Sequence, residues 1–260
     1  MNRQPALFLS HGSPTLPLER SAATDFLRRL GPALGRPEAI LMVSAHWDTE
    51  RPTVGGAERP ETIYDFYGFP PELYRLRYPA PGAPMLARRV AGLLAEQGFA
   101  TDIDPERGLD HGAWTPLILA YPKADIPVTQ LSIQSHLGTE HHVRLGEALR
   151  PLRDEGVLIL ASGGATHNLR ELSRQRGNRV PQAWTAEFNE WLAEALLARR
   201  TADLVDYRTR APQAVRNHPT EEHLIPVYVA LGAGDPGGTT QRLHSSIESG
   251  VISMDAYRFN

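Results

Sequence analysis

The sequence has no cysteine among its 260 residues. Disulfide bonds and thiolate metal sites are therefore excluded, and any metal has to be bound by His, Asp or Glu. The chain also lacks an apolar run of about 18 residues, the length that a membrane-spanning helix needs. Pro5 and His11 interrupt the charged-then-apolar order of a signal peptide. We therefore expect a cytoplasmic protein that does not enter a membrane.

A strong charge of one sign is missing as well. Charged residues make up 22% of the chain and the formal net charge is -3, without a basic cluster of the kind that binds nucleic acid. Hydrophobic residues make up 41%, which is ordinary for a globular protein. The length suits one large α/β domain, so we expect a single domain over residues 1–260, present as a monomer or a homodimer.

Several common catalytic signatures are absent. The sequence contains no Gly-x-Ser-x-Gly elbow, no His-Glu-x-x-His helix and no phosphate-binding loop of the Walker type. Residues 232–237 do match Gly-x-Gly-x-x-Gly, but they follow an expected helix and include Pro236. No βαβ unit surrounds them, so we reject a dinucleotide site.

The sequence does contain a repeated pattern in which a short apolar segment is followed by a histidine. The segments begin at Ala6, Ala39, Val128 and Val157, and the histidines are His11, His46, His136 and His167. Apolar segments that alternate with helical patterns predict a central, mostly parallel sheet flanked by helices on both faces. Ligands of such sheets bind beyond the carboxyl ends of the strands, so these histidines are candidates for one shared site. His136 stays undecided, because Leu-Gly follows it as in a plain turn.

The remaining segments complete this α/β pattern. Helices are expected at residues 21–30, 84–97, 141–155, 183–199 and 221–231, from apolar spacing and their end signals. A strand is expected at 99–103, an irregular stretch at 104–114, and an edge strand or hairpin at 246–259. Residues 50–84, rich in Pro, Gly and aromatics, form a loop long enough to suggest a function.

Two further histidines are candidates for the site. His223 lies at the start of the expected helix 221–231, where Thr220 suits the N-cap and Glu222 suits the positive helix end. His111 precedes Gly112, which allows close backbone approach, although a structural histidine in a tight turn explains the motif nearly as well. We expect three other histidines to lie on the surface: His141, His142 and His244.

Aromatic side chains near these histidines suit a planar substrate. Tyr64, Trp47 and Trp114 are the expected flat walls, and Ser13 is an expected polar contact. The phenylalanines of the same loop are better explained by core packing. Three or four His ligands without Cys suit Zn²⁺ or Fe²⁺, and a site with open positions can activate water or bind O₂.

Six motifs, taken together and in this order, resemble the 4,5-DOPA-type extradiol ring-cleavage dioxygenases. This group belongs to the class III extradiol superfamily, which includes the catalytic subunit of protocatechuate 4,5-dioxygenase. The motifs span about residues 7 to 232. They are Ser10–Pro14, Ser44–Trp47, Tyr64–Pro70, Asp110–Trp114, Ala165–Asn168 and His218–His223.

The resemblance implies one divalent metal per chain, in a pocket at the carboxyl ends of the strands. It implies His11, His46 and His223 as metal ligands, with Fe²⁺ for activity and Zn²⁺ as an occupant of the purified protein. Protocatechuate enzymes use a Glu as third ligand, where this chain has His223. His167 is implied as the acid/base catalyst or as a further ligand, and His111 as a pocket histidine that contacts substrate or oxygen.

The implied reaction opens a small catechol, DOPA or a similar diol, with O₂ to give a semialdehyde. Two alternatives use the same residues: a zinc hydrolase with metal-bound hydroxide, and a non-enzymatic metal-binding protein on the same fold. The presence of His111 and His167 beside the ligands favours an enzyme, because an inert protein needs no proton-transfer groups.

Overall fold

One mixed sheet forms the centre of the molecule. The computed structural model describes residues 3–175 and 180–260, and within them eight strands pair in the order β4-β3-β5-β2-β6-β1-β10-β7. The four central strands are mutually parallel. They are β5 (Val128–Ile133), β2 (Ala39–Asp48), β6 (Val157–Gly163) and β1 (Ala6–Ser10). The expected mostly parallel sheet is confirmed at its centre.

Antiparallel pairing occurs toward both sides of this parallel centre. On one side, β10 (Ala256–Phe259) pairs antiparallel with β1, and β7 (Thr240–His244) pairs antiparallel with β10. On the other side, β3 (Thr53–Gly55) meets β5 antiparallel and β4 (Asp102–Asp104) parallel. The C-terminal hairpin is confirmed as β8 (Ile247–Glu248) and β9 (Ile252–Ser253), whereas β10 lies inside the sheet and not at its edge.

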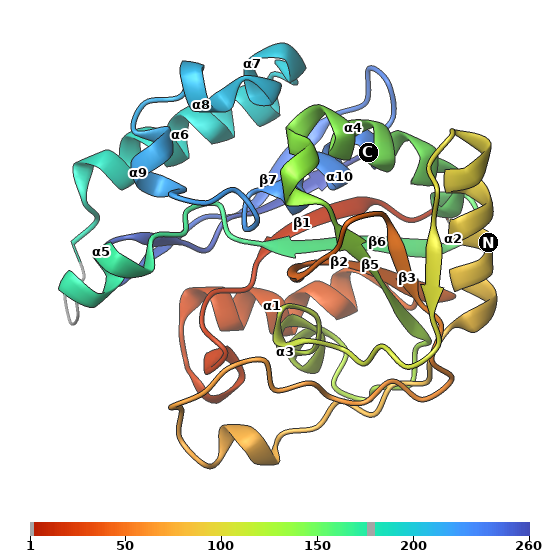
Figure 1. Ribbon diagram of the computed structural model, residues 1–260. Coiled ribbons are helices and arrows are strands. Elements are labelled where there is room, and N and C mark those ends of the chain that lie inside the picture. Colours follow the sequence, from red (N-terminus) through yellow and green to blue (C-terminus); the bar gives the residue numbers. More distant parts are fainter. Residues whose placement is uncertain (1–2, 176–179) are drawn as a thin grey trace.

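Helices cover both faces of the sheet (Figure 1). One face carries α2 (Pro84–Glu96), α4 (Gly138–Leu149), α6 (Ala183–Leu197) and α10 (Ile225–Ala233). The opposite face carries α1 (Ala22–Leu34) and α3 (His111–Ala120). Strand β2 contributes side chains to the cores on both faces of the sheet. Leu41 and Val43 pack into one core, and Ile40 and Met42 pack into the other. A strand buried on both faces needs an uninterrupted apolar run, which this sequence supplies.

Short helices occur in several of the connecting segments. The α-helical ones are α5 (Leu169–Arg174), α7 (Thr201–Val205), α8 (Tyr207–Arg210) and α9 (Ala214–Asn217). The 3₁₀ turns are η1 (Leu16–Leu18), η2 (Leu73–Arg75), η3 (Ser135–Leu137) and η4 (Arg150–Arg153). Among the residues that the structure describes, none of the helices combines the length and apolar character that crossing a bilayer requires.

Several expected boundaries are wrong for local reasons. The helix expected at 221–231 begins only at Ile225, and Thr220 donates its hydroxyl hydrogen to Glu222 in place of capping it. The stretch expected to be irregular up to Trp114 already contains the start of α3, whose N-cap is Asp110. The helix expected at 141–155 ends at Leu149 and continues as η4. The strand expected at 99–103 is β4, which begins at residue 102.

Candidate metal centre

Five histidines meet at the carboxyl ends of the central strands. His11 follows β1, His46 lies near the end of β2, and His167 follows β6. His111 is the first residue of α3, and His223 lies in the turn before α10. The ring centroids of His46 and His111 lie 3.9 Å apart, and those of His11 and His46 lie 4.9 Å apart. Three of the four histidines that follow an apolar segment, His11, His46 and His167, thus meet in one cluster.

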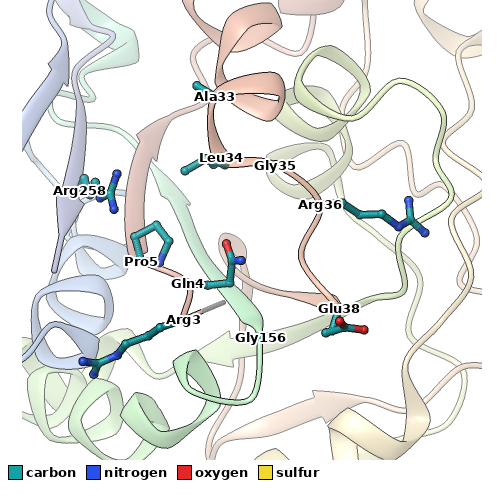
Figure 2. Close-up of a pocket in the computed structure, with 10 residues that line it drawn as sticks. All are labelled: Arg3, Gln4, Pro5, Ala33, Leu34, Gly35, Arg36, Glu38, Gly156 and Arg258. Carbon is teal, nitrogen blue, oxygen red and sulfur yellow. The ribbon is translucent and has the colours of Figure 1, made fainter. Parts of the chain in front are cut away.

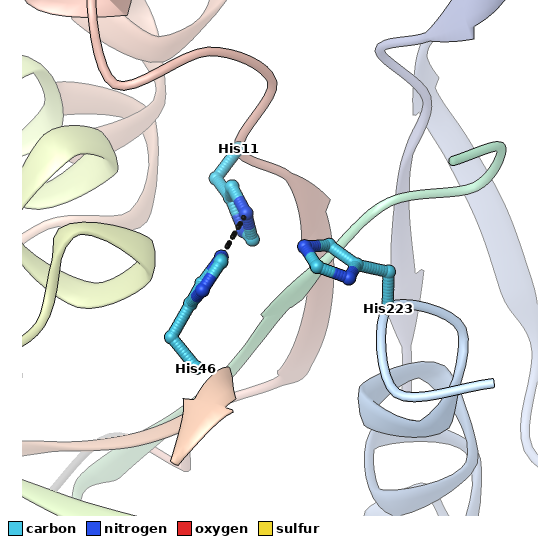
Figure 3. A group of neighbouring side chains, drawn as sticks. All are labelled: His11, His46 and His223. Atoms are coloured by element: carbon cyan, nitrogen blue, oxygen red, sulfur yellow. Dashed lines mark hydrogen bonds between the residues drawn. The ribbon is translucent and has the colours of Figure 1, made fainter. Parts of the chain in front are cut away.

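Three of these histidines are arranged to bind one cation (Figure 3). One ring nitrogen from each of His11, His46 and His223 lies within 4.8 Å of the other two. The Nε2 atoms of His11 and His46 are 3.0 Å apart. Two nitrogens bound to a tetrahedral metal at about 2.1 Å lie roughly 3.4 Å from each other. The donor set therefore fits a divalent ion with only a small movement of the two rings.

The hydrogen bond at His11 Nδ1 explains why its Nε2 is available to a metal. The Nδ1 atom of His11 lies 3.0 Å from the Ser162 hydroxyl oxygen, and that hydroxyl donates to the Gly112 carbonyl at 2.5 Å. Since the hydroxyl hydrogen is already used, the oxygen accepts from Nδ1–H and leaves the lone pair on Nε2. The Gly112 carbonyl is free to accept because Pro116, four residues on, has no N–H to bond it.

A carboxylate has the same effect on His223. Its Nδ1 lies 3.0 Å from the Glu222 carboxylate, an acceptor when ionised, so Nδ1 carries the proton and Nε2 carries the lone pair. His167 stacks on this ring, with centroids 3.4 Å apart and an interplanar angle of 7°. The backbone N–H of His167 donates to the Asn217 carbonyl, and this bond fixes the loop that holds the stacked ring.

The fifth histidine is held by a residue that the sequence did not single out. His111 donates its backbone N–H to one oxygen of Asp65 at 2.9 Å, and its Nδ1 lies 2.9 Å from the other oxygen. The same carboxylate lies 3.5 Å from Nδ1 of His46. Burial would raise the pKa of Asp65, but the hydrogen bonds from His111 outweigh it and the pKa is lowered. Asp65 is part of the aromatic motif Tyr64–Pro70, and its position there was the only signal for it in the sequence.

Burial keeps four of the clustered rings neutral. Burial, and after it repulsion among the histidines, lowers the pKa of His11 and of His223 well below the ordinary value of 6.5. Burial and the neighbouring His111 lower the pKa of His46 to about 4, against the opposite effect of nearby carboxylates. Burial also lowers the pKa of His167 to about 4. Neutral imidazoles are the form that binds metal ions.

The start of α3 is fixed by a buried network around Asp110. Its carboxylate accepts from the Ser44 hydroxyl at 2.6 Å and from the Gln130 amide at 2.7 Å, and it pairs with Arg107 at 2.9 Å. The Arg107 guanidinium lies 4.7 Å from the ring centre of Trp47. The network positions His111 next to the cluster and covers one face of Trp47, which had been expected to contact a substrate.

The other expected substrate contacts lie near the site but have partners within the protein. Trp114 is 0% exposed and donates its Nε1–H to the Ile63 carbonyl, so it belongs to the core. The Tyr64 hydroxyl donates to the Leu76 carbonyl, and the Ser13 hydroxyl lies 2.8 Å from that of Thr15. None of these contacts tests binding of a ligand, and the roles of Ser13, Trp47, Tyr64 and Trp114 stay predictions.

Four further histidines lie outside the cluster. His136 belongs to η3, where its ring is half-exposed, and His141 and His244 are partly buried. His142 was expected on the surface and is instead fully buried. Its Nδ1 bonds the Gly138 carbonyl at 2.6 Å and its Nε2 accepts from the Gln134 N–H at 3.1 Å. Both ring nitrogens thus stabilise the start of α4.

A cavity of about 620 Å³ lies at the opposite ends of the strands (Figure 2). Pro5 and Gly156, which precede β1 and β6, mark this end of the sheet. Arginines line the cavity, but Arg3 pairs with Asp154 and Asp235, and Arg36 pairs with Asp125. None of the histidines of the cluster lines this cavity, so the cavity is separate from the candidate metal centre.

Comparisons with known proteins find likeness over almost the whole chain. Residues 5–259 match the family described as the catalytic LigB subunit of aromatic ring-opening dioxygenase. The chain is 44% identical over 262 residues to a 4,5-DOPA dioxygenase extradiol of Beta vulgaris, covering 99% of this chain and 97% of the relative. A protein of the same name from Escherichia coli K12 is 43% identical over 256 residues, covering 97% and 93%.

A solved structure resembles the whole fold. The crystal structure of an uncharacterized protein, JW3007 from Escherichia coli K12, superposes with a TM-score of 0.84 at 38% sequence identity. The likeness covers 99% of this chain and 100% of that one.

Proposed function

Because the chain belongs to the LigB family of aromatic ring-opening dioxygenases, we propose that its histidine cluster opens a small DOPA-like catechol with O₂. The family makes the protein an extradiol ring-cleaving enzyme with a metal cofactor, an aromatic substrate and O₂ as the second substrate. The observation that carries the proposal is the group of neutral imidazoles whose ring nitrogens converge at the rim of the sheet.

The ligand set that we propose is His11, His46 and His223, with Fe²⁺ as the active metal. Bound Fe²⁺ would supply open positions for the diol and O₂ and a route for electrons between them, which redox-inert Zn²⁺ lacks. Ser162 and Glu222 hold the Nδ1 protons of His11 and His223, so that each Nε2 keeps its lone pair and would be free to bind the ion. Ligand rings that are fixed in this way need only a small movement when the metal binds.

We assign the proton transfers to His167 and the second contact with substrate or oxygen to His111. His167 is neutral at pH 7, since burial lowers its pKa to about 4, and it accepts a proton only from a strongly acidified group such as a metal-bound diol. Stacking on His223 holds its ring next to the ligand set. Phe66 lies against His111 with ring centres 5.6 Å apart, and its apolar ring covers that side of His111.

Oxygen uptake tests the proposed function. The full chain is stripped of metal, loaded anaerobically with Fe²⁺ or Zn²⁺, and mixed with DOPA or simpler catechols in air-saturated buffer. We expect one O₂ consumed per catechol and a yellow semialdehyde with Fe²⁺ only. A stoichiometrically loaded iron protein that consumes no O₂ with any catechol would refute the proposal.

We also propose that the protein is cytoplasmic and is a monomer or a homodimer. Both rest on the composition of the chain and not on the site. Size-exclusion chromatography with light scattering measures the oligomeric state. A mass above that of a dimer would exclude a monomer or homodimer.

A further inference from the structure

The long segment between β3 and α2 places one carboxylate, that of Asp65, against two rings of the cluster. One oxygen accepts the His111 backbone N–H at 2.9 Å, and the other lies 2.9 Å from His111 Nδ1 and 3.5 Å from His46 Nδ1. We propose that Asp65 is a positioning residue that fixes the proton of His111 on Nδ1, so that His111 Nε2 offers its lone pair to the reacting groups. This inference rests on the proposed function of the cluster.

The backbone around Asp65 is held firmly enough for this task. Ile63 donates its N–H to the Leu109 carbonyl at 2.8 Å, and Leu109 donates back to Glu61 at 2.7 Å. Trp114 of α3 donates its indole N–H to the Ile63 carbonyl at 2.9 Å. The segment before Asp65 is therefore tied to the residues on both sides of His111.

Aromatic packing holds the residues on either side of Asp65. The Tyr64 ring lies 6.1 Å from the Trp114 ring centre, and its hydroxyl donates to the Leu76 carbonyl. The Phe66 ring lies 6.3 Å from Trp114 and 5.6 Å from His111. Because both neighbours are packed, the carboxylate has little freedom to turn away from His111.

Hydrogen-bond chemistry then fixes the His111 tautomer. An ionised carboxylate only accepts hydrogen bonds, so the ring nitrogen that faces it must carry a proton. Nε2 is left without one and points away from Asp65. A second, weaker contact with His46 Nδ1 lets the same carboxylate restrain the ring of a proposed ligand, and such partners commonly orient the ligands of metal sites.

Asp65→Asn is a sharp test, because the backbone N–H of His111 can only donate. The one oxygen of the asparagine stays on that N–H, and its NH₂ group then faces Nδ1. Nδ1 has to accept, so the proton moves to Nε2 and the lone pair is lost from the reactive side. An equivalent replacement in the catalytic triad of serine proteases leaves the geometry intact and lowers kcat by about 10⁴ through the wrong tautomer.

The first measurement does not depend on turnover. Imidazole ¹⁵N NMR of the full chain loaded with Zn²⁺ reports which nitrogen of His111 carries the proton, with His111→Gln used to assign the signal. We expect Nδ1–H in the wild type and Nε2–H in Asp65→Asn. Persistence of Nδ1–H in Asp65→Asn would overturn the proposal.

The second measurement is O₂ uptake by the iron-loaded protein. We expect Asp65→Asn to lower kcat by about 10²-fold with KM within about threefold, and to be at least as harmful as Asp65→Ala, which leaves the ring free to choose its tautomer. A merely structural role predicts the reverse order, with the isosteric Asn milder than Ala. Glu72→Gln serves as the matched control, because Glu72 is a carboxylate of the same segment and makes no hydrogen bond to the cluster.

The two proposals fail in different ways. A kcat of Asp65→Asn within twofold of the wild type would overturn the role of Asp65 alone. A wild type that consumes no O₂ with any catechol would overturn the proposed function, and the tautomer of His111 would still decide the role of Asp65. Asn is isosteric with Asp, so the test stands even where Asp65→Ala fails to fold.

Discussion

The two ends of the parallel strands show opposite ways of placing polar groups. At the carboxyl ends, the site histidines are mostly buried, four of them are neutral, and nearby oxygens fix the Nδ1 protons of His11, His111 and His223. At the amino ends, an open cavity is lined by arginines that pair with carboxylates at the surface. The difference teaches that the proposed site is marked by its convergent lone pairs and not by the volume of a cavity.

The largest expected effect comes from removing a ligand. His46→Ala removes one of the three converging nitrogens, so we expect iron content to fall from about one per chain to near zero and ring cleavage to be lost. Arg36→Ala, in the cavity at the other end of the strands, should leave both unchanged, since its ion pair with Asp125 is exposed. Elemental analysis after anaerobic loading and O₂ uptake measure the two properties. Full iron content in His46→Ala would remove His46 from the ligand set.

A smaller but still large loss of activity is expected when His167, whose ring stacks on His223, is replaced. His167→Gln should keep the metal and lower kcat by about 10²- to 10⁴-fold, the range for loss of a general acid or base. Metal content and steady-state kinetics distinguish a role of His167 as acid/base catalyst from a role as metal ligand. Loss of iron in parallel with activity would show that His167 is a ligand.

A moderate loss of metal affinity is expected when the Ser162 hydroxyl, which bonds His11 Nδ1, is removed. Ser162→Ala removes the acceptor of His11 Nδ1–H, so the ring loses its fixed tautomer, and metal affinity should fall by about 10- to 100-fold. Competition with a chelator of known affinity measures the change. Ser135→Ala, at a partly buried serine in η3 whose hydroxyl donates to Asp48, is the matched control. An unchanged affinity in Ser162→Ala would mean that the tautomer is fixed in another way.

The smallest expected effect is that of mild acid on metal binding. Folding lowers the pKa of His46 to about 4 and those of His11 and His223 well below 6.5, so the neutral forms persist as pH falls until it approaches those lower values. Zn²⁺ affinity should therefore change by less than about threefold between pH 7.5 and 5.5. Three ligands with the ordinary pKa of about 6.5 would lose about a thousandfold over the same range through proton competition. Calorimetric titration at the two pH values distinguishes these outcomes.

The rim histidines could be predicted from the sequence because strand ends are local signals. Apolar runs that end in His11 or His46 predict both the strand and its exit, and parallel strands bring such exits to one edge. The helix expected at 84–97 ends at Glu96, because Pro84 and Gly98 mark its limits clearly. Family resemblance added the reaction, which composition and spacing alone do not specify.

The parts that could not be predicted depend on contacts between distant segments. Gly112 and Pro116 oppose a helix locally, yet α3 forms because Asp110 caps it and Ser162 satisfies the carbonyl that Pro116 leaves free. His142 looked like a surface residue, and only the fold shows that it bonds the backbone of Gln134. Asp65 lies 46 residues before His111, and no periodicity links the two.

Anomalous scattering tests the central claim most directly. Crystals of the full chain, loaded anaerobically with Fe²⁺, are measured at the iron absorption edge. We predict one iron peak per chain within bonding distance of Nε2 of His11, His46 and His223, with the His167 ring beside it and not bonded. A peak bonded to His167 in place of one of these ligands, or an iron-free cluster in protein that contains stoichiometric iron, would contradict the account.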